Sequence, residues 1–278
     1  MSTSHSPTQN RLLAALQPAE YDRVLSHMEL VPLPLGWVVY ESGRPQAYAF
    51  FPTTSVVSLL CVTENGSSAE IAVTGNEGLV GIALLMGSET TSSRAVVQSA
   101  GYAYRVKAGF LKREFETGSP LQQLLLRYAH ALMAQMAQTA ACNRHHTVEQ
   151  RLSRWLLASL DRLSTNELRM TQELIANMLG VRREGVTEAA GKLQESGTIH
   201  YSRGHITVLD RAQLEARACE CYGVVRKEVE RLLPKPVADF AWSFTKIGPA
   251  SGSPRPAAAS AVLHRTGTYT DTRVFRER

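Results

Sequence analysis

The sequence predicts an α+β protein with an N-terminal antiparallel β-roll, one long helix and a C-terminal winged helix-turn-helix. Short runs rich in β-branched and aromatic residues alternate with Gly, Pro and Asn between residues 31 and 104. A helical pattern of apolar residues begins after Ser119-Pro120, and a two-helix corner followed by a hairpin pattern ends near residue 208. We therefore expect four parts, which are residues 10–117, 118–146, 147–233 and a disordered tail, 234–278.

The composition is that of a soluble globular protein and argues against two other classes. Apolar residues make up 44% and charged residues 20% of the 278 residues, which is enough for two modest domains with their own cores. The sequence has no run of 18 apolar residues and no basic start followed by an apolar block. We therefore expect no membrane span and no secretory signal, and we expect the protein in the cytoplasm.

The β-rich runs predict an antiparallel roll rather than a parallel sheet, because they are short and separated by turn residues. The runs are WVVY, YAFF, SVVSLLCV, AEIAV, RAVVQ and YAYRV. Residues 10–28 show the apolar spacing of one or two short helices before the roll, and residues 107–116 predict another helix after it. Residues 78–86 are expected to form either a short helix or a loop.

The helix that opens at Ser119-Pro120, with Ser as N-cap and Pro in the first turn, has a narrow apolar seam. The seam residues follow one another in steps of four and three: Leu121, Leu125, Tyr128, Leu132 and Met136. Such a seam is typical of a helix that pairs with a partner helix, although a helix of an ordinary bundle shows it too. No acidic residue lies between Ser119 and Asn143, so we favour a homodimer seam.

The positive charge of the chain lies in its C-terminal half. The net charge is +5, yet residues 1–117 carry eight basic and ten acidic side chains. Residues 144–235 carry fifteen basic and twelve acidic side chains. A basic surface suits contact with a polyanion, but many solvated surfaces are equally basic.

The stretch MTQELIANMLGVRREGVTEAAGKLQESGTI predicts two short helices that meet at a tight corner. Ala176 is small where the second helix crosses the first, and Gly180 can take the left-handed backbone that the corner needs. The apolar side chains expected inside the angle are Ile175, Leu179, Val181, Val186 and Ala189. A helical hairpin in a core does not need this combination, so the seven positions favour a helix-turn-helix.

The flanking sequence fits the same interpretation. Residues 147–163 predict an amphipathic helix, and Thr147 and Gln150 have the spacing of a capping box. After the corner, two β-runs around Ser202-Arg203-Gly204 predict a small hairpin, the wing, and residues 208–233 are expected to be helical.

Three stretches, TQELIANMLGVRREGV, GHITVLD and TGNEGLVGIALLMG, resemble the CRP/FNR family of bacterial transcription regulators. The resemblance spans roughly residues 10–230 and is most specific in the corner. It implies a cyclic-nucleotide-binding-like roll that acts as a sensor domain, a homodimer, and site-specific binding to double-stranded DNA. It also makes RNA polymerase a candidate partner.

In this family the second helix of the corner enters the major groove, and an Arg-Glu pair near its start contacts base edges. Arg183 and Glu184 stand at those positions. A guanidinium can pair with O6 and N7 of guanine, and a carboxylate can accept from N4 of cytosine. The alternative is that both side chains only cap and solvate the helix. Glu188 replaces a basic residue of the best-known members, and it either reads another cytosine or faces away.

The other predicted DNA contacts position the protein on phosphates rather than read bases. Arg182 stands where relatives often have a Ser N-cap, and the lost cap is offset by a phosphate contact in this prediction. The remaining phosphate-binding residues are Thr171, Gln172, Lys192, Ser202 and Arg203. Thr187 is predicted as a further DNA contact without an assigned role.

The roll lacks the signatures of two known sensors. Relatives that bind cAMP carry a Glu and an Arg-Ser pair in the roll, where this sequence has Ile82 and Ser92-Ser93, with Arg94 nearby. The Thr-Ser that holds adenine is replaced by Met136-Ala137. No cysteine precedes Cys61, so an FNR-type iron–sulfur cluster is not expected. We predict no cofactor and leave the effector open; axial haem ligands are available in His130, Cys142 and His145-His146.

The four cysteines are too few and too scattered for a disulfide framework. Cys219-Glu220-Cys221 lacks the CxxC spacing, and no second ligand pair lies nearby in the sequence, so we expect free thiols and no metal site. No Ser/His/Asp spacing, P-loop or metal motif supports an enzyme. The alternative to a DNA-binding regulator is a cyclic-nucleotide-binding module that controls another protein.

Overall fold

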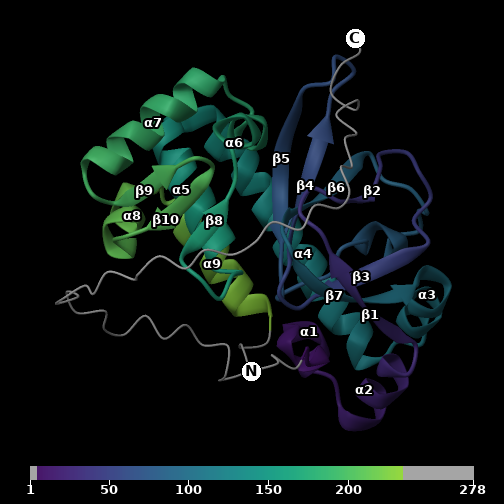
Figure 1. Cartoon of the computed structure of the whole chain (residues 1–278). Helices are drawn as coiled ribbons and strands as arrows, with labels where there is room; N and C mark the ends of the chain where they lie inside the picture. The colour runs from purple at the N-terminus through teal and green to yellow at the C-terminus, as the bar shows by residue number, and fades with distance from the viewer. Residues whose placement is uncertain (1–4, 234–278) are drawn as a thin grey trace, which may run out of the picture. The chain divides into compact units, whose positions relative to one another are not determined.

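The computed structural model describes residues 5–233, which lie in one structural unit, Met1–Trp242 (Figure 1). The predicted tail, residues 234–278, lies outside the described residues. The predicted α+β architecture is confirmed: antiparallel strands come first, one long helix follows, and helices with a small sheet come last. The boundaries predicted between these parts stay a prediction.

Short helices precede the roll, as the spacing in residues 10–28 predicts. They are η1 (Pro7–Gln9), α1 (Arg11–Ala14) and α2 (Pro18–Leu25). The buried Asn10 holds α1 to the roll. Its side-chain oxygen caps α1 by accepting from the amides of Leu12 and Leu13. Its side-chain amide donates to the carbonyl oxygens of Pro52 and Gly78, both at 2.9 Å, so every polar atom of this buried side chain has a partner.

The roll consists of two antiparallel sheets, with strand orders β1-β7-β3 and β2-β6-β4-β5. The strands are β1 (Met28–Leu33), β2 (Val38–Tyr40), β3 (Tyr48–Pro52), β4 (Val56–Val62), β5 (Ser68–Thr74), β6 (Ser93–Ser99) and β7 (Gly101–Lys107). Each of the six predicted runs contributes a strand. β1 is an additional strand, and it begins where the predicted N-terminal helix ends.

Two short helices complete the roll. The segment predicted as a helix or a loop contains a 3-10 helix, η2 (Ile82–Leu85), and the helix predicted after the last strand is α3 (Ala108–Glu116). The sheets, α3 and the N-terminal helices enclose one hydrophobic cluster, in which Phe51 and Leu111 are fully buried.

The long helix α4 (Pro120–His145) closes this cluster (Figure 1). Ser119 is its N-cap and Pro120 its first residue, as predicted, but the Ser119 side chain makes no capping hydrogen bond. Four of the five predicted seam residues, Leu121, Leu125, Tyr128 and Leu132, are buried in the cluster, and Met136 packs against it.

The assignment to a homodimer seam is therefore wrong for the four buried residues, whereas for the half-buried Met136 it stays a prediction. The seam attaches α4 to the roll of its own chain, and the Tyr128 hydroxyl lies 2.8 Å from the Thr74 hydroxyl of β5 in hydrogen-bond contact. Packing against a sheet and packing against a partner helix both require an apolar residue every three or four positions, so the spacing alone did not separate them.

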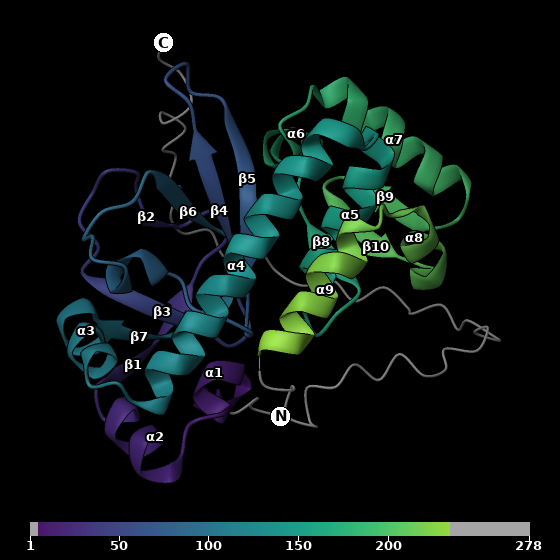
Figure 2. The ribbon, with the colours of Figure 1, turned by 180° about the vertical axis from the view of Figure 1, so that it is seen from behind.

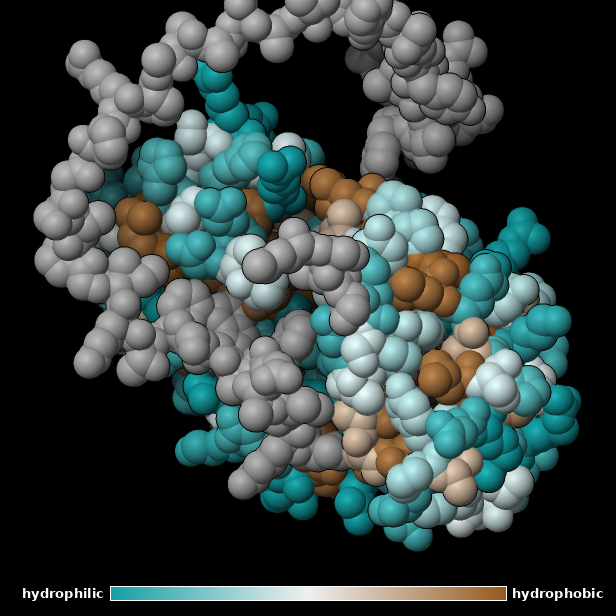
Figure 3. All heavy atoms as spheres, turned by 60° about the horizontal axis from the view of Figure 1, so that its bottom comes forward, coloured by the Kyte–Doolittle hydropathy of each residue, from teal (hydrophilic) through white to brown (hydrophobic). Residues whose placement is uncertain are grey.

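Another face of α4 is exposed and apolar. Leu126 and Met133 are 53% and 54% exposed, and Ala137, Ala140 and Ala141 continue the same stripe toward the end of the helix. We call these five residues the α4 stripe. Figure 2 shows α4 from the side away from the roll. On the described surface visible in Figure 3, hydrophobic residues lie in separate patches among hydrophilic ones, as is usual for protein surfaces.

The C-terminal part is a winged helix-turn-helix. Its helices are α5 (Val148–Leu160), α6 (Gln172–Leu179), α7 (Arg183–Glu195), α8 (Arg211–Arg217) and α9 (Cys221–Leu232). The predicted capping box is confirmed, because Thr147 and Gln150 bond to each other's backbone amides at the start of α5. The wing strands β9 (Ile199–Ser202) and β10 (His205–Val208) are also confirmed. An unexpected strand, β8 (Glu167–Arg169), completes a sheet of order β8-β10-β9.

The corner helices pack against the roll as well as against one another. Val56, Leu60 and Val73 from the roll belong to the same hydrophobic cluster as the buried residues of α5, α6 and α7. Beside this cluster, the guanidinium of Arg162 pairs with Glu77 at 2.7 Å, and both side chains are only 9% exposed. A continuous core and a buried ion pair thus join the roll to the corner.

The last helix, α9, returns along α4 (Figure 2). The sequence predicted one helical region over residues 208–233, whereas the structure has two helices separated at residues 218–220. The break lets α9 lie beside α4, with Gln138 donating to the sulfur of Cys221 at 3.1 Å. No helix within residues 5–233 combines the length and apolarity that crossing a membrane requires.

Candidate DNA-binding site

The corner between α6 and α7 has the geometry that the sequence predicts. Thr171 is the N-cap of α6 and accepts a hydrogen bond from the amide of Leu174 at 3.3 Å. Gly180 ends the helix with a φ of +62°, the left-handed conformation in which a side chain is disfavoured. The amide of Val181 then donates to the carbonyl of Ala176 at 3.0 Å, which fixes the turn between the two helices.

The apolar residues predicted inside the angle are confirmed as core. Ala176 is 3% exposed, so the crossing point is closely packed. Ile175, Leu179, Val186 and Ala189 are buried with it, and Val181 packs against the same cluster. Because these residues fix both helices, α7 has one defined face left for solvent.

That exposed face of α7 carries the predicted base-reading and phosphate-binding side chains. They are Arg183, Glu184, Thr187, Glu188 and Lys192, all exposed. Arg182 is the N-cap and makes no capping hydrogen bond through its side chain, as expected for a residue that replaces Ser. The face is therefore polar from the first turn of the helix to its last.

The wing turn places Arg203 beside the start of α6. Arg203 and Gly204 have φ values of +50° and +79° and link two paired strands, a combination typical of a tight two-residue hairpin turn. Positive φ is uncommon for Arg, and Asn or Gly is the usual choice at such a position. A strained residue that keeps a long cationic side chain at an exposed turn is a candidate for function.

The corner and the wing share one surface hollow of about 500 Å³. It is lined by Thr171, Gln172, Glu173, Arg183, Tyr201, Arg203 and Gly204. Four of the predicted DNA contacts thus meet around one concavity built from α6, α7 and the wing. Glu184, Glu188 and Lys192 lie elsewhere on α7, and Ser202 is an exposed wing residue outside the lining.

Two side-chain contacts within this region bear on the predicted roles. Thr187 donates to the side-chain oxygen of Gln172 at 2.8 Å, which ties α7 to the start of α6. Glu188 accepts from Lys192 at 2.8 Å. This hydrogen bond and the lysine charge lower the pKa of the Glu188 carboxyl, while the carboxylate raises the pKa of Lys192. Glu188 is thus an exposed, paired residue, and Lys192 is partly neutralised.

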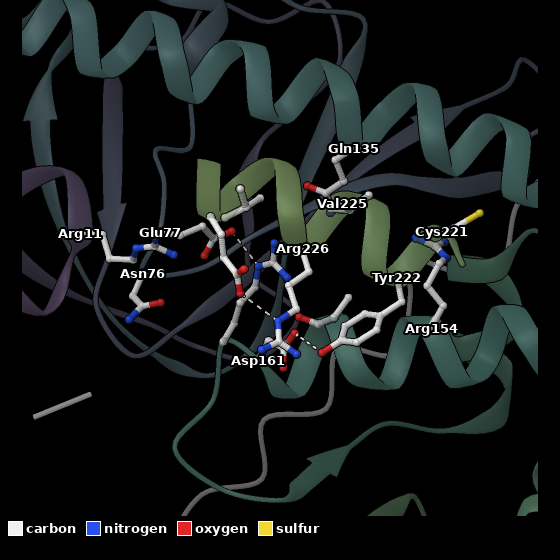
Figure 4. Close-up of a pocket in the computed structure, with 14 residues that line it drawn as sticks. Arg11, Asn76, Glu77, Gln135, Arg154, Asp161, Cys221, Tyr222, Val225 and Arg226 are labelled. Atoms are coloured by element: carbon white, nitrogen blue, oxygen red, sulfur yellow. Dashed lines mark hydrogen bonds and ion pairs between the residues drawn. The ribbon is translucent and has the colours of Figure 1, made fainter. Parts of the chain in front are cut away.

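A second cavity, of about 300 Å³, lies between α4, α5, α9 and the roll (Figure 4). Its lining is rich in charge, but the charges mostly neutralise one another. Arg162 pairs with Glu77 and Arg226 with Glu230, while Tyr222 donates to Asp161 at 2.9 Å. The cavity therefore has a mixed lining in which most charged groups already have protein partners.

The positions that hold a cyclic nucleotide in relatives look different here. Ile82 begins the 3-10 helix η2, and Arg94, which follows Ser92-Ser93 in the sequence, lies 3.2 Å from the carboxylate of Glu41. Met136 packs against the roll core. The expectation that this roll lacks the arginine for a cyclic phosphate stays a prediction.

Sequence reasoning missed one cluster. Cys142, His146, Cys219 and Cys221 each offer a ligand atom, and these atoms lie within 4.8 Å of one another. A second pair of ligand-type residues, distant in the sequence, lies near Cys219 and Cys221 in space, because α9 returns to the end of α4. The sequence signals were two separate pairs: Cys219 and Cys221, and Cys142 and His146, whose spacing puts both on one side of a helix.

Comparison with known proteins agrees with this geometry. Residues 150–217 match the family described as Crp-like helix-turn-helix domain. No match was found among curated proteins.

Solved structures resemble a larger part of the chain. A CRP/FNR family regulator from Eubacterium rectale superimposes with a TM-score of 0.60 at 18% identity, over 75% of this chain and 97% of that chain. FixK2 from Bradyrhizobium japonicum gives 0.60 at 16% identity, over 69% and 98%. The c-di-GMP responsive regulator CLP from Xanthomonas campestris gives 0.55 at 18% identity, over 69% and 99%.

At these identities the similarity concerns the fold, and it includes both the roll and the corner. Together with the matched domain, it bears out the predicted resemblance. The chain has the fold of the CRP/FNR family of transcription regulators, with a Crp-like helix-turn-helix domain at residues 150–217.

Proposed function

We propose that the protein is a homodimeric, site-specific DNA-binding transcription regulator that inserts α7 into the major groove. The observation that carries the proposal is the joint exposure of the start of α7, the start of α6 and the wing turn around one hollow. A helix has the width that the major groove of B-DNA admits, and flanking elements can then reach phosphates on either side.

Arg183 and Glu184 are the proposed base readers. Both are exposed in the first turn of α7, the part of a recognition helix that contacts base edges in helix-turn-helix proteins. Arg183 pairs with a guanine and Glu184 accepts from a cytosine, so the two side chains favour a guanine and a cytosine at neighbouring positions. The buried corner supports this role, because it leaves the recognition face in one orientation.

Phosphate contacts are assigned to residues around the readers. Thr171 and Gln172 present the N-terminus of α6, where backbone amides and the helix dipole favour an anion. Arg203 and Ser202 present the wing turn, and Arg182 adds a charge at the corner. Thr187 and Lys192 must first give up their hydrogen bonds to Gln172 and Glu188 before they can contact DNA. Their contribution is therefore weaker than that of a side chain without a protein partner.

The α4 stripe is the proposed dimer surface. Its large residues, Leu126 and Met133, lie seven positions apart, and the alanines that follow permit close approach of a second helix. A second copy of the same helix is the simplest partner for such a stripe, because a two-fold axis lets each stripe cover the other. Dimerisation then gives two α7 helices and predicts an operator made of two inverted half-sites.

Selection of bound sequences from random double-stranded DNA tests the main proposal. The expected result is an inverted repeat with half-sites about one helical turn apart. Recovery of no enriched sequence at low salt from the folded protein would contradict site-specific binding.

Two variants distinguish a residue that recognises bases from a residue that contacts phosphates. Arg183→Ala is expected to relax the preference at one base pair by about 1–3 kcal/mol. Arg203→Ala is expected to weaken binding to all DNA sequences alike. It is also expected to reduce the salt dependence of binding by the equivalent of about one phosphate contact. If Arg183→Ala kept both affinity and specificity, the groove assignment would be wrong.

The dimer surface has its own test. Met133→Glu places a charge in the α4 stripe and is expected to give a folded monomer by analytical ultracentrifugation. Glu64→Lys, in a turn of the roll, is the matched surface control and is expected to keep the dimer. A dimeric Met133→Glu protein at micromolar concentration would refute the assignment of the stripe.

A further inference from the structure

One cluster of ligand-type side chains lies outside the proposed DNA-binding surface. Cys142 and His146 come from the end of α4, Cys219 lies between α8 and α9, and Cys221 begins α9. Their four ligand atoms lie within 4.8 Å of one another, the only such group found among the described residues. The three cysteines are buried together in a small cluster separate from the two hydrophobic cores.

The spacing of these atoms suits one tetrahedral ion. The Sγ atoms of Cys142 and Cys219 are 3.5 Å apart, and the Sγ of Cys221 is 3.5 Å from Nδ1 of His146. Around a zinc ion, bonds of about 2.3 Å to sulfur and about 2.0–2.1 Å to nitrogen place neighbouring ligand atoms roughly 3.5–3.8 Å apart. The cluster therefore needs only small side-chain adjustments to close around a single ion.

We propose that Cys142, His146, Cys219 and Cys221 form a Cys3His site for one thiophilic divalent ion of the zinc class. Three sulfurs and one imidazole are ligands typical of closed structural zinc sites. The burial of the cysteines fits a closed site that leaves no position for substrate.

The surroundings of the ligands fit the same site. Nε2 of His146 lies 3.2 Å from the carboxylate of Glu220, so the carboxylate orients the ring and leaves Nδ1 to face the sulfurs. The side-chain amide of Gln138 donates to the Sγ of Cys221 at 3.1 Å, which suits a sulfur that carries negative charge. Both contacts would fix the orientation of a ligand and tune its affinity for the metal.

Charge balance provides a further argument. Three thiolates and one divalent cation leave a net charge of −1 in a buried place. Arg151 and Arg154 of α5 are 7% and 8% exposed, both interact electrostatically with Cys142, and the Nε atom of each is buried without a hydrogen-bond partner. Burying two cations is costly unless a negative group lies nearby, and an anionic metal site supplies one.

The site has a mechanical consequence, which rests on the proposed function. His146 is the residue that ends α4, and Thr147 begins α5, so the ion ties the end of the long helix to the last helices of the corner domain. Loss of the ion frees α9 and the α4–α5 junction together. We therefore expect DNA affinity to fall when the ion is removed, even though no ligand touches the DNA-binding surface.

Metal content of the full chain tests the site directly. Protein purified under reducing conditions with Zn²⁺ present is expected to hold one zinc per chain by inductively coupled plasma mass spectrometry. Replacement by Co²⁺ is expected to give the visible absorption of a tetrahedral thiolate complex. Cys219→Ser and His146→Ala are each expected to lower bound zinc below about a fifth of a mole per chain, whereas Cys61→Ser, at an exposed thiol of the roll, keeps it.

A graded variant guards against simple misfolding. Glu220→Gln keeps all four ligands and is expected to weaken zinc affinity by about 10–100-fold, as loss of second-shell partners does. Wild-type protein that binds less than a tenth of a mole of zinc per chain and gives no cobalt spectrum after full reduction would overturn the site. A Cys142–Cys219 disulfide in the purified protein would also overturn the site, if the chain still binds no metal after this disulfide has been reduced. Normal zinc binding with no DNA binding would instead refute the proposed function alone.

Discussion

A buried carboxyl between the roll and the corner makes the stability of this protein depend on pH. Glu70 of β5 lies in contact with the hydroxyl of Ser58, with 2.6 Å between the oxygens, and burial raises the pKa of its carboxyl to about 7. The same hydroxyl lies 2.9 Å from the side-chain oxygen of Gln98, whose amide donates to Ser159 of α5 at 2.6 Å. These four side chains form a chain of hydrogen bonds from the sheet to the corner domain.

Burial is the main reason why the neutral form of Glu70 is favoured, and it outweighs the charges of Arg154 and Arg162 and the hydrogen bond from Ser58, which lower the pKa. The hydrogen-bond pattern limits what the Ser58 bond can contribute. The Ser58 hydroxyl has one proton and faces two acceptors, the Glu70 carboxylate and the Gln98 oxygen. When Glu70 is protonated it donates to Ser58, which then donates to Gln98, so each contact has one proton. When Glu70 is ionised, one acceptor loses its donor in a buried place, and both that loss and the burial of charge destabilise the folded state.

The magnitude follows from the shift. The pKa rises from 4.5 to about 7 on folding, and one pKa unit corresponds to about 1.4 kcal/mol. Between these two values the folded state binds more protons than the unfolded state, so the free energy of unfolding falls as pH rises. The loss begins near the unfolded pKa, is complete above the folded one, and amounts to about 3 kcal/mol.

Glu70→Gln tests this reasoning, because Gln resembles the protonated carboxyl and can donate to Ser58 without titrating. Urea unfolding of both proteins at pH 5, 6, 7 and 8 is the assay. We expect the Glu70→Gln protein to be more stable than wild type by about 1 kcal/mol at pH 5, where the loss has begun, and by about 3 kcal/mol at pH 8. Glu64→Gln, at an exposed turn of the same hairpin, is expected to follow wild type throughout. Parallel curves for wild type and Glu70→Gln would refute a raised pKa at Glu70.

Two further stability predictions come from the corner and its attachment. Gly180→Val forces a β-branched residue to a φ of +62° and is expected to lower the free energy of unfolding by about 1–3 kcal/mol. Gly191 lies in α7 with open space around it, so Gly191→Ala is expected to raise the free energy of unfolding by about 0.5–1 kcal/mol. Equal effects of the two glycine substitutions would contradict the corner geometry. Arg162→Met leaves Glu77 buried without its partner and is expected to cost about 3–5 kcal/mol in urea unfolding. The double variant with Glu77→Gln is expected to recover part of that loss, whereas additive losses would argue against the pair.

The corner was predictable from the sequence because its constraints are local. A left-handed residue at Gly180, a small residue at Ala176 and apolar residues at fixed offsets all follow from two short helices crossing closely. The same holds for the wing and for the capping box at Thr147. Each depends on residues a few positions apart, so their geometry is determined by backbone rules that apply within a single chain segment.

The role of the α4 seam was not predictable, because two partners suit the same spacing. The residues at Leu121 and Leu125 pack against the roll, and the stripe that remains exposed is shifted by one position, to Leu126. A shift of one residue turns a helix face by about 100°. The position of the roll therefore decides which face of α4 is buried and which stays exposed. That information comes from tertiary packing against strands far away in the sequence, such as β1, and the helix sequence does not contain it.

The cysteine cluster shows the same limit more strongly. Cys142 and Cys221 are separated by the whole corner domain, and they meet only because the chain breaks near Cys219 and returns along α4. Sequence motifs for metal sites rely on ligand pairs within short loops, such as CxxC. A site assembled from a helix end and a helix break has no such motif, and the sequence showed only its two separate pairs, Cys142 with His146 and Cys219 with Cys221.

Two polar contacts from the roll reach α5 and the residues directly after it, beside the direct packing of β5 on α6. Gln98 of the roll bonds to Ser159 of α5, Arg162 at its C-terminal end pairs with Glu77 of the roll, and Arg151 at its other end donates to the carbonyl of Leu179, the last residue of α6. A rigid, buried helix transmits displacement at one end to the other. A change in the roll therefore reaches the corner either through α5 or through the direct packing of β5 on α6. The hydrogen-bond chain from Glu70 ends on Ser159 of α5, and the proposed ion site lies near Arg151 and Arg154 of the same helix, so protonation and metal loss are expected to act on the same element.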